Sequence, residues 1–151
     1  AKGEPAEGHA LGNHTYSHAS TPSLLESELV DELQVTQELI TKQTGRAPTM
    51  FRPPYGATDD QVLDIVGSEN LSQVLWTGTT LDWSLRDVKK IKAAVYRLAR
   101  PNGVILMHDV VPQTVKAMPA IVKELKKRGY HLVTVPTLYR KKGMEAGVSY
   151  P

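Results

Sequence analysis

Two histidines stand four positions apart near the start of the chain, in the segment His14-Thr15-Tyr16-Ser17-His18. Side chains at positions i and i+4 share one face where the backbone coils, so both imidazoles can reach one divalent ion. A catalytic metal usually takes three protein ligands and keeps one position for water. We therefore expect a third ligand, normally a carboxylate, from elsewhere, because no residue near the two histidines is an obvious candidate. Thr15 or Ser17 is expected to hold the loop and not to bind metal.

Three further blocks contain residue types that serve hydrolysis. His108 ends an apolar run, a setting in which one imidazole can act as a general acid near neutral pH. A carboxylate beside it, such as Asp82, would raise the pKa of the imidazole and stabilise its cationic form. Arg52 can pair with a carboxylate in a bidentate geometry. The blocks are Arg52-Pro53-Pro54-Tyr55-Gly56, Asp82-Trp83 and Leu106-Met107-His108-Asp109.

Each block also has a purely structural interpretation. An isolated pair of histidines is more often two polar loop residues, and a lone histidine such as His108 is more often a satisfied core residue. Asp82 would serve as a helix cap, because it lies just ahead of a predicted helix. A Pro-Pro-Tyr-Gly segment is typical of a rigid turn, and Trp83 and Leu106 alone would be assigned to the core.

Strands and helices alternate along the chain in a way that places these blocks at strand ends. The apolar spacing of Leu25, Leu29 and Leu33, with Gly45 just past the end, predicts an amphipathic helix over residues 23–44. The segment 58–61 resembles a capping box that opens the next helix. Such alternation predicts an α/β fold with a parallel sheet, whose reactive groups gather at the carboxyl ends of the strands. Strands are expected at 8–13, 49–52, 71–76, 104–107 (buried on both faces) and 130–135, helices at 23–44, 58–67, 88–100 and 114–128, and a tail over the last dozen residues.

Length and charge exclude several classes of protein. The 151 residues suit one domain, whereas a closed (β/α) barrel typically needs about 250 residues and seldom fewer than about 200. The formal net charge is only +2, and the one dense basic cluster, Lys123 with Lys126, Lys127 and Arg128, ends a predicted helix, so we expect no nucleic-acid binding. No stretch of about 18 apolar residues is present, so a membrane span is not expected. The absence of cysteine excludes disulfides and thiol chemistry.

The four blocks, in this order, resemble the second to fifth motifs of the polysaccharide deacetylase family, also called the NodB-homology or carbohydrate esterase family 4 domain. The resemblance covers about residues 8 to 139. Each block alone is weak evidence, but four in the order of the family are highly specific. The chain is therefore identified as a member of this family.

The resemblance implies an incomplete, distorted (β/α) barrel with a parallel sheet, formed by one domain over residues 1–151. The first motif of the family, Thr-Phe-Asp-Asp-Gly, supplies the catalytic base and the third metal ligand, and this sequence does not contain it. The chain begins roughly where the second helix of the family leads to the third strand, so the first βα units are expected to be absent. A fragment of a full deacetylase is the favoured explanation. A separate N-terminal segment or chain and a degenerate homologue are the alternatives.

The resemblance also implies a role for each candidate residue. His14 and His18 would bind a divalent metal ion, with zinc the leading expectation and cobalt or nickel as alternatives. His108 would protonate the leaving group, Asp82 would support it, and Arg52 would pair with the base of the first motif. The backbone N–H of Tyr55 would stabilise the oxyanion. Trp83, Leu106 and Pro54 would contact substrate. Thr79 departs from the family, which often has Asp at that position.

The implied reaction is removal of an acetyl group from an N- or O-acetylated polysaccharide such as chitin, peptidoglycan or acetylated xylan, outside the cell or at the cell wall. The alternative is a non-catalytic carbohydrate- or metal-binding homologue, motivated by the missing base. Carboxylates that would replace the third ligand are Glu4, Glu7, Asp59 and Asp109, and their spacing favours none of them.

Overall fold

The computed structural model describes residues 7–151. The chain forms two compact units: unit 1 comprises Ala1–Leu75 and Thr134–Pro151, and unit 2 comprises Trp76–Val133. Both contain helices and parallel strand pairs, so the predicted α/β class is confirmed. The strands do not close into a barrel within residues 7–151, as expected for an incomplete barrel. One domain over residues 1–151 stays a prediction.

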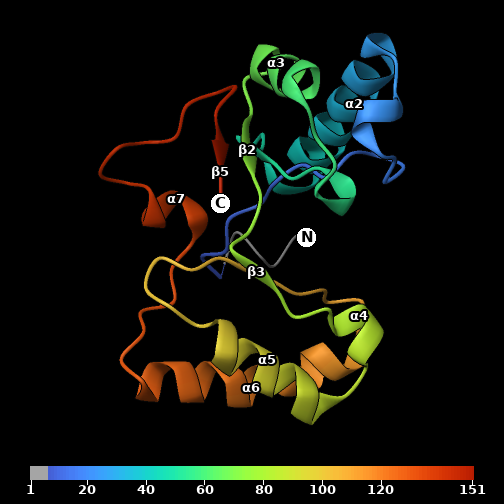
Figure 1. Cartoon of the computed structure of the whole chain (residues 1–151). Coiled ribbons are helices and arrows are strands. Elements are labelled where there is room, and N and C mark those ends of the chain that lie inside the picture. The colour runs from blue at the N-terminus through green and yellow to red at the C-terminus, as the bar shows by residue number, and fades with distance from the viewer. Residues whose placement is uncertain (1–6) are drawn as a thin grey trace. The chain divides into compact units, whose positions relative to one another are not determined.

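The longest helix of unit 1 is α2, Glu26–Thr44, preceded by the 3₁₀ turn η1, Thr21–Ser23. Its apolar stripe buries Leu29 and Leu33 against Phe51 and the apolar face of a second helix. The two helices lie next to each other in Figure 1. Gly45 ends α2 in the left-handed conformation at φ +76°, which glycine adopts without a Cβ penalty. The predicted amphipathic helix is therefore confirmed.

That second helix is α3, Asp60–Ser68. Its N-cap is Asp59, whose side chain accepts the backbone N–H of Val62 at 2.8 Å. The expected capping box at 58–61 was therefore wrong in part, because the N-cap is Asp59 and not Thr58, and a single side-chain bond caps the helix. Thr58 instead donates its hydroxyl to the fully buried amide of Gln73, 2.9 Å away.

A three-stranded parallel sheet in the order β1-β2-β5 completes unit 1. The predicted strand at 8–13 is reduced to a single parallel bridge between Asn13 and Phe51. The predicted C-terminal tail was wrong, because β5 pairs Tyr150 with Val74 of the central strand. The unit also contains a short helix after residue 134. The remaining elements are β1 Met50–Phe51, the 3₁₀ turn η2 Pro54–Gly56, β2 Ser72–Val74, α7 Val135–Leu138 and β5 Ser149–Tyr150.

Unit 2 is a two-stranded parallel sheet with a helical pair. Helices α5 and α6 run side by side and enclose a core that includes Ile91, Val95 and Ile121 (Figure 1). Strands β3 and β4 pair Thr79 with Leu106. The elements are β3 Gly78–Thr79, α4 Asp82–Leu85, α5 Val88–Leu98, β4 Ile105–Leu106 and α6 Pro112–Lys127.

Three expectations for the second half of the chain were wrong in part. Strand β4 is only half-buried and not buried on both faces. Helix α6 begins at Pro112, which suits a first turn, and continues through Pro119. Residues 130–134 form no helix and pair with no strand that the structure describes, and Leu132 and Val133 are about half exposed. No helix within residues 7–151 is long and apolar enough to cross a bilayer.

Candidate metal-binding loop and acid pair

The two histidines of unit 1 lie side by side. The imidazole rings of His14 and His18 have centroids 4.9 Å apart and meet edge to face at 72°. Nδ1 of His14 lies 2.5 Å from the backbone oxygen of Arg52. A carbonyl oxygen can only accept, so Nδ1 carries the hydrogen and the lone pair is on Nε2, the form of imidazole that binds metals. The pair is therefore the candidate for two ligands of a divalent metal ion.

The segment between the two histidines is held in a strained conformation. Thr15 and His18 have φ of +64° and +59°, a left-handed region that costs a residue other than glycine about 1 to 3 kcal/mol. The hydroxyl oxygen of Thr15 accepts the backbone N–H of His18 at 3.0 Å. Side-chain bonds within the loop thus help to close the turn that brings the two rings together, as expected for Thr15.

The carboxylate of Glu32, from α2, binds the middle of this loop. The backbone N–H groups of Tyr16 and Ser17 both donate to Oε2 at 2.7 Å, and Oγ of Ser17 donates to Oε1 at 2.5 Å. Burial raises the pKa of Glu32, but the bonds from Ser17 and Tyr16 outweigh it, so the pKa lies below its usual value. Glu32 is therefore an anion that satisfies three donors of the loop.

Asn13 ties the start of the same loop to α2. Its side chain is 1% exposed, and Oδ1 accepts the backbone N–H of Thr15 at 3.0 Å. Nδ2 donates to the backbone oxygen of Leu33 and to Oε1 of Gln37 at 2.9 and 3.0 Å. All polar atoms of this buried amide have partners, as stability requires. The loop thus begins at a residue that is held both by its side chain and by the parallel bridge to Phe51.

Tyr55 lies against the second histidine. Its ring centroid is 4.8 Å from that of His18, and its side chain is 72% exposed. Its φ is +61°, so the backbone is again left-handed, between Pro54 and Gly56. Among residues 7–151 the N–H of Tyr55 has no hydrogen-bond acceptor. This amide is the group to which the sequence assigned oxyanion stabilisation.

Arg52 is bound to backbone oxygens. Its Nε donates to the oxygen of Val74 and its Nη2 to the oxygen of Leu75, both at 3.1 Å. Burial lowers the pKa of Arg52, and no carboxylate within residues 7–151 forms an ion pair with it. Arg52 thus links the carboxyl ends of β1 and β2, while its own backbone oxygen binds His14.

In unit 2, Asp82 and His108 follow the carboxyl ends of β3 and β4. The paired register of these strands brings the residues that follow them close together. Oδ1 of Asp82 lies 2.7 Å from Nδ1 of His108, and Oδ2 accepts the backbone N–H of His108 at 2.6 Å. The hydroxyl of Thr114 donates to Oδ2 at 2.7 Å, and the backbone N–H of Trp83 lies 3.0 Å from Oδ1. The predicted proximity of Asp82 and His108 is observed.

Asp82 is fully buried, yet it is ionised. Burial raises its pKa, but hydrogen bonds from His108 and Thr114 together with the charge of His108 outweigh it, so the pKa lies below the usual value. The side chain of His108 is 38% exposed. The pair therefore combines a buried anion that orients the ring with an imidazole that solvent can reach.

The three predicted substrate-contacting residues differ in exposure. Trp83 is 56% exposed, Leu106 is half-buried and Pro54 is buried. Trp83 and Leu106 lie in unit 2 and Pro54 lies in unit 1. An exposed tryptophan offers an apolar face of the kind that stacks on sugars, whereas the buried ring of Pro54 stiffens its turn.

No third metal ligand is found beside the two histidines within the described residues, where no group of three or more His, Cys, Asp or Glu side chains could hold a metal ion. Glu7 lies 3.9 Å from His9, Asp59 caps α3, and Asp109 is an exposed residue of unit 2. Glu4, the other carboxylate considered, lies outside the described residues.

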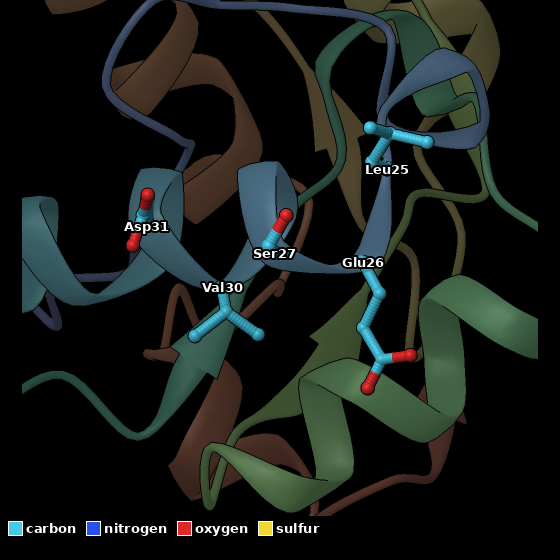
Figure 2. Close-up of a pocket in the computed structure, with 5 residues that line it drawn as sticks. All are labelled: Leu25, Glu26, Ser27, Val30 and Asp31. Atoms are coloured by element: carbon cyan, nitrogen blue, oxygen red, sulfur yellow. The ribbon is translucent and has the colours of Figure 1, made fainter.

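An open pocket of about 550 Å³ lies on the first turns of α2 and contains none of the candidate residues (Figure 2). Figure 2 shows Leu25 and Val30 together with two acidic side chains and a serine. None of these side chains is a histidine, and none bonds to the loop that carries His14 and His18. The pocket is lined by Leu25, Glu26, Ser27, Val30 and Asp31.

Sequence reasoning missed Glu32, Asn13 and Thr114. Glu32 and Thr114 lie on helices that are distant in sequence from the groups they bind, so no local pattern indicates them. Asn13 had a usable signal, because a polar residue that directly precedes His14 at a strand end must find partners if it is buried.

Comparison with known proteins links the chain to deacetylases. The polysaccharide deacetylase family model matches residues 1–74. A peptidoglycan-N-acetylglucosamine deacetylase, PgdA, of Listeria monocytogenes is 33% identical over 149 residues, which are 99% of this chain and 31% of that protein. The chain thus spans about a third of the length of this curated relative.

Solved structures agree with the sequence match. A deacetylase solved with substrate superimposes with a TM-score of 0.94 at 35% identity, over 99% of this chain and 74% of that one. A CE4 family pseudoenzyme from Bacillus anthracis gives a TM-score of 0.85 at 28% identity, over 91% of this chain and 48% of that one. These likenesses confirm the predicted fold type.

Proposed function

This chain belongs to the polysaccharide deacetylase family, and we propose that it removes acetyl groups from an acetylated polysaccharide by metal-assisted hydrolysis. The observation that carries the proposal is the bond between buried Asp82 and the accessible ring of His108. Peptidoglycan is the leading substrate, because PgdA is named for an N-acetylglucosamine of that polymer. Chitin and acetylated xylan are the alternatives. Such polymers place the proposed activity outside the cell or at the cell wall.

His108 is proposed as the general acid. Nδ1 is held by the carboxylate of Asp82, so Nε2 is the nitrogen that exchanges a proton with substrate. In its protonated form, His108 would donate the Nε2 proton to the leaving amine or alkoxide. Thr114 keeps the carboxylate ionised and in place.

His14 and His18 are proposed to hold a divalent ion, with zinc as the leading choice and cobalt or nickel as alternatives. When bound, the ion would polarise the acetyl carbonyl and lower the pKa of a coordinated water. The backbone of Arg52 fixes the tautomer of His14. The N–H of Tyr55, which has no hydrogen-bond acceptor among residues 7–151, is proposed to donate to the developing oxyanion. Pairing of Arg52 with a carboxylate base stays a prediction.

A non-catalytic carbohydrate- or metal-binding homologue is the second candidate. The likeness to a CE4 family pseudoenzyme favours it, as does the lack of a third metal-binding side chain beside His14 and His18 within residues 7–151. Such a protein would keep the loop and the exposed Trp83 and bind glycan without hydrolysis.

Acetate release distinguishes the two candidates. The chain is incubated with Zn²⁺ and N-acetylated peptidoglycan fragments, chito-oligosaccharides or acetylated xylan, and free acetate is measured. Release by the wild type and by His131→Ala, an exposed histidine used as control, with loss of release in His108→Ala while Zn²⁺ is still bound, would support the hydrolase and would mean that another group replaces the first motif. Binding of glycan without any release by the wild type would support the non-catalytic candidate.

A further inference from the structure

The loop that carries His14 and His18 needs an external support. It turns through two left-handed residues that are not glycine, Thr15 and His18, so it does not favour this shape by itself. Between these two positions, the backbone N–H groups of Tyr16 and Ser17 point to one acceptor. That acceptor is the carboxylate of Glu32, which lies 14 residues beyond the loop in sequence.

The geometry of this contact is that of an anion held by successive backbone N–H groups. Two neighbouring amides donate to a single oxygen of Glu32 at equal distances of 2.7 Å, and the hydroxyl of Ser17 donates to the other oxygen. Concave arrangements of consecutive N–H groups bind anions, and bonds to an ionised acceptor are stronger than neutral ones. Here the protein supplies the anion from its own helix.

The support itself is rigid. Glu32 lies in the second turn of α2, a 19-residue helix, and the next residue, Leu33, is fully buried in the core of unit 1. Asn13 anchors the start of the loop to the same turn of α2 through the oxygen of Leu33. Among residues 7–151 no lysine or arginine forms an ion pair with Glu32, so the donors of the loop are the partners of its charge.

We propose that Glu32 is a positioning residue for the imidazole pair, which it places by fixing the backbone between His14 and His18. Its carboxylate bonds to Tyr16 and Ser17 and not to either imidazole, so it acts through the loop and is not itself a ligand. This inference rests on the proposed function in one respect, namely that the pair binds a divalent ion.

Two measurements on the full chain test this role. Amide hydrogen exchange at Tyr16 and Ser17 reports whether Glu32 holds the loop, with no metal present. Titration with Co²⁺, followed by visible absorption, reports the affinity of the pair and the geometry around the ion. The variants are Glu32→Ala, which removes the acceptor, and Glu32→Gln, which keeps one acceptor oxygen. Glu38→Ala is the matched control, because Glu38 is an exposed glutamate of the same helix.

In Glu32→Ala we expect both amides to exchange at least about 10-fold faster and the Co²⁺ absorption spectrum to change. We also expect Co²⁺ to bind about 10- to 100-fold more weakly, the range that is typical of losing a group that orients a ligand. Glu32→Gln should lie between Glu32→Ala and the wild type. Glu38→Ala should match the wild type in every measurement, and the circular dichroism of all variants should be unchanged.

Two results would overturn the proposal, and they differ. If the wild type binds Co²⁺ and Glu32→Ala binds it equally well with the same spectrum, the positioning role is wrong while the proposed function stands. If the wild type and Glu38→Ala bind no Co²⁺, the assignment of His14 and His18 as ligands is wrong, and the positioning role fails with it.

Discussion

The carboxylate of Asp82 binds His108 twice, through the backbone N–H at 2.6 Å and through Nδ1 of the ring at 2.7 Å. One buried anion thereby fixes both the position of the backbone and the orientation of the imidazole. Such a double contact is possible because β3 and β4 are parallel and in register, so that the residues following each strand meet. The same carboxylate determines how unit 2 responds to pH.

Replacement of Asp82 by Asn tests this anion. The amide nitrogen of Asn cannot accept a hydrogen bond, so donors from His108 and Thr114 lose a partner, and we expect the free energy of unfolding at pH 7 to fall by about 1 to 3 kcal/mol. The pKa of Asp82 is lowered in the folded state, so its stabilisation is present above the unfolded value of about 3.8 and is lost as the pH falls through the folded value. Urea denaturation between pH 7 and the lowest pH at which the wild type stays folded measures both effects.

The control for this variant is Asp64→Asn, which changes an exposed aspartate of α3. The difference between the wild type and Asp82→Asn should shrink in acid, whereas Asp64→Asn should match the wild type throughout. A difference for Asp82→Asn that is constant with pH would contradict the assignment of an ionised Asp82.

Thr114→Val removes one donor to Asp82 while keeping the shape of the side chain. Thr114 is 2% exposed and donates to Oδ2 at 2.7 Å. We expect the pKa of Asp82, measured by carboxyl NMR, to rise towards its usual value because the charged form has lost a hydrogen bond. Stability should then fall by about 1 kcal/mol at pH 7, and the acid-dependent loss should be smaller and end at a higher pH, because the folded pKa lies closer to the unfolded value. Thr114→Ser keeps the hydroxyl and should restore the wild-type pKa.

Zinc affinity tests the histidine pair directly. His14→Ala and His18→Ala each remove one imidazole, and we expect each to weaken zinc binding by more than the roughly 10- to 100-fold that follows loss of a group that merely orients a ligand. Calorimetry measures the affinity, and His131→Ala controls for loss of an exposed histidine. If the double variant at 14 and 18 binds zinc as the wild type does, the pair is not the metal site.

Local patterns predicted the elements that depend on neighbouring residues. The helix containing Leu29 and Leu33 follows from the spacing of its apolar residues, and the pairing of Asp82 with His108 follows from two strand ends in a parallel sheet. The strand predicted at 130–135 was wrong because β-branched and apolar residues favour a strand only where a partner exists, and Leu132 and Val133 have none among the described residues.

Contacts between distant segments could not be predicted in this way. Strand β5 consists of two residues and depends on pairing with β2, which no pattern within residues 140–151 reveals. Glu32 likewise is one of several glutamates on a polar helix face, and only the fold brings it to Tyr16 and Ser17. The loop motif identifies the two imidazoles but not the group that holds their backbone.

Close approach of two glycines fixes the connection that leads into β5. A Cβ built on Gly67 would lie 2.7 Å from Cα of Gly147, which belongs to the backbone and cannot rotate away. Alanine in the middle of a helix normally gains about 1 kcal/mol over glycine, but overpacking of this kind costs about 1 to 3 kcal/mol. The clash should prevail, so Gly67→Ala is expected to lower the free energy of unfolding and to increase amide exchange at Tyr150, the β5 residue paired with Val74.

The control is Asp64→Ala, on the exposed face of the same helix. It introduces the higher helix propensity of alanine without the clash with Gly147, so its free energy of unfolding should be unchanged or higher. Equal stability of the two variants would mean that the connection before β5 does not depend on this approach.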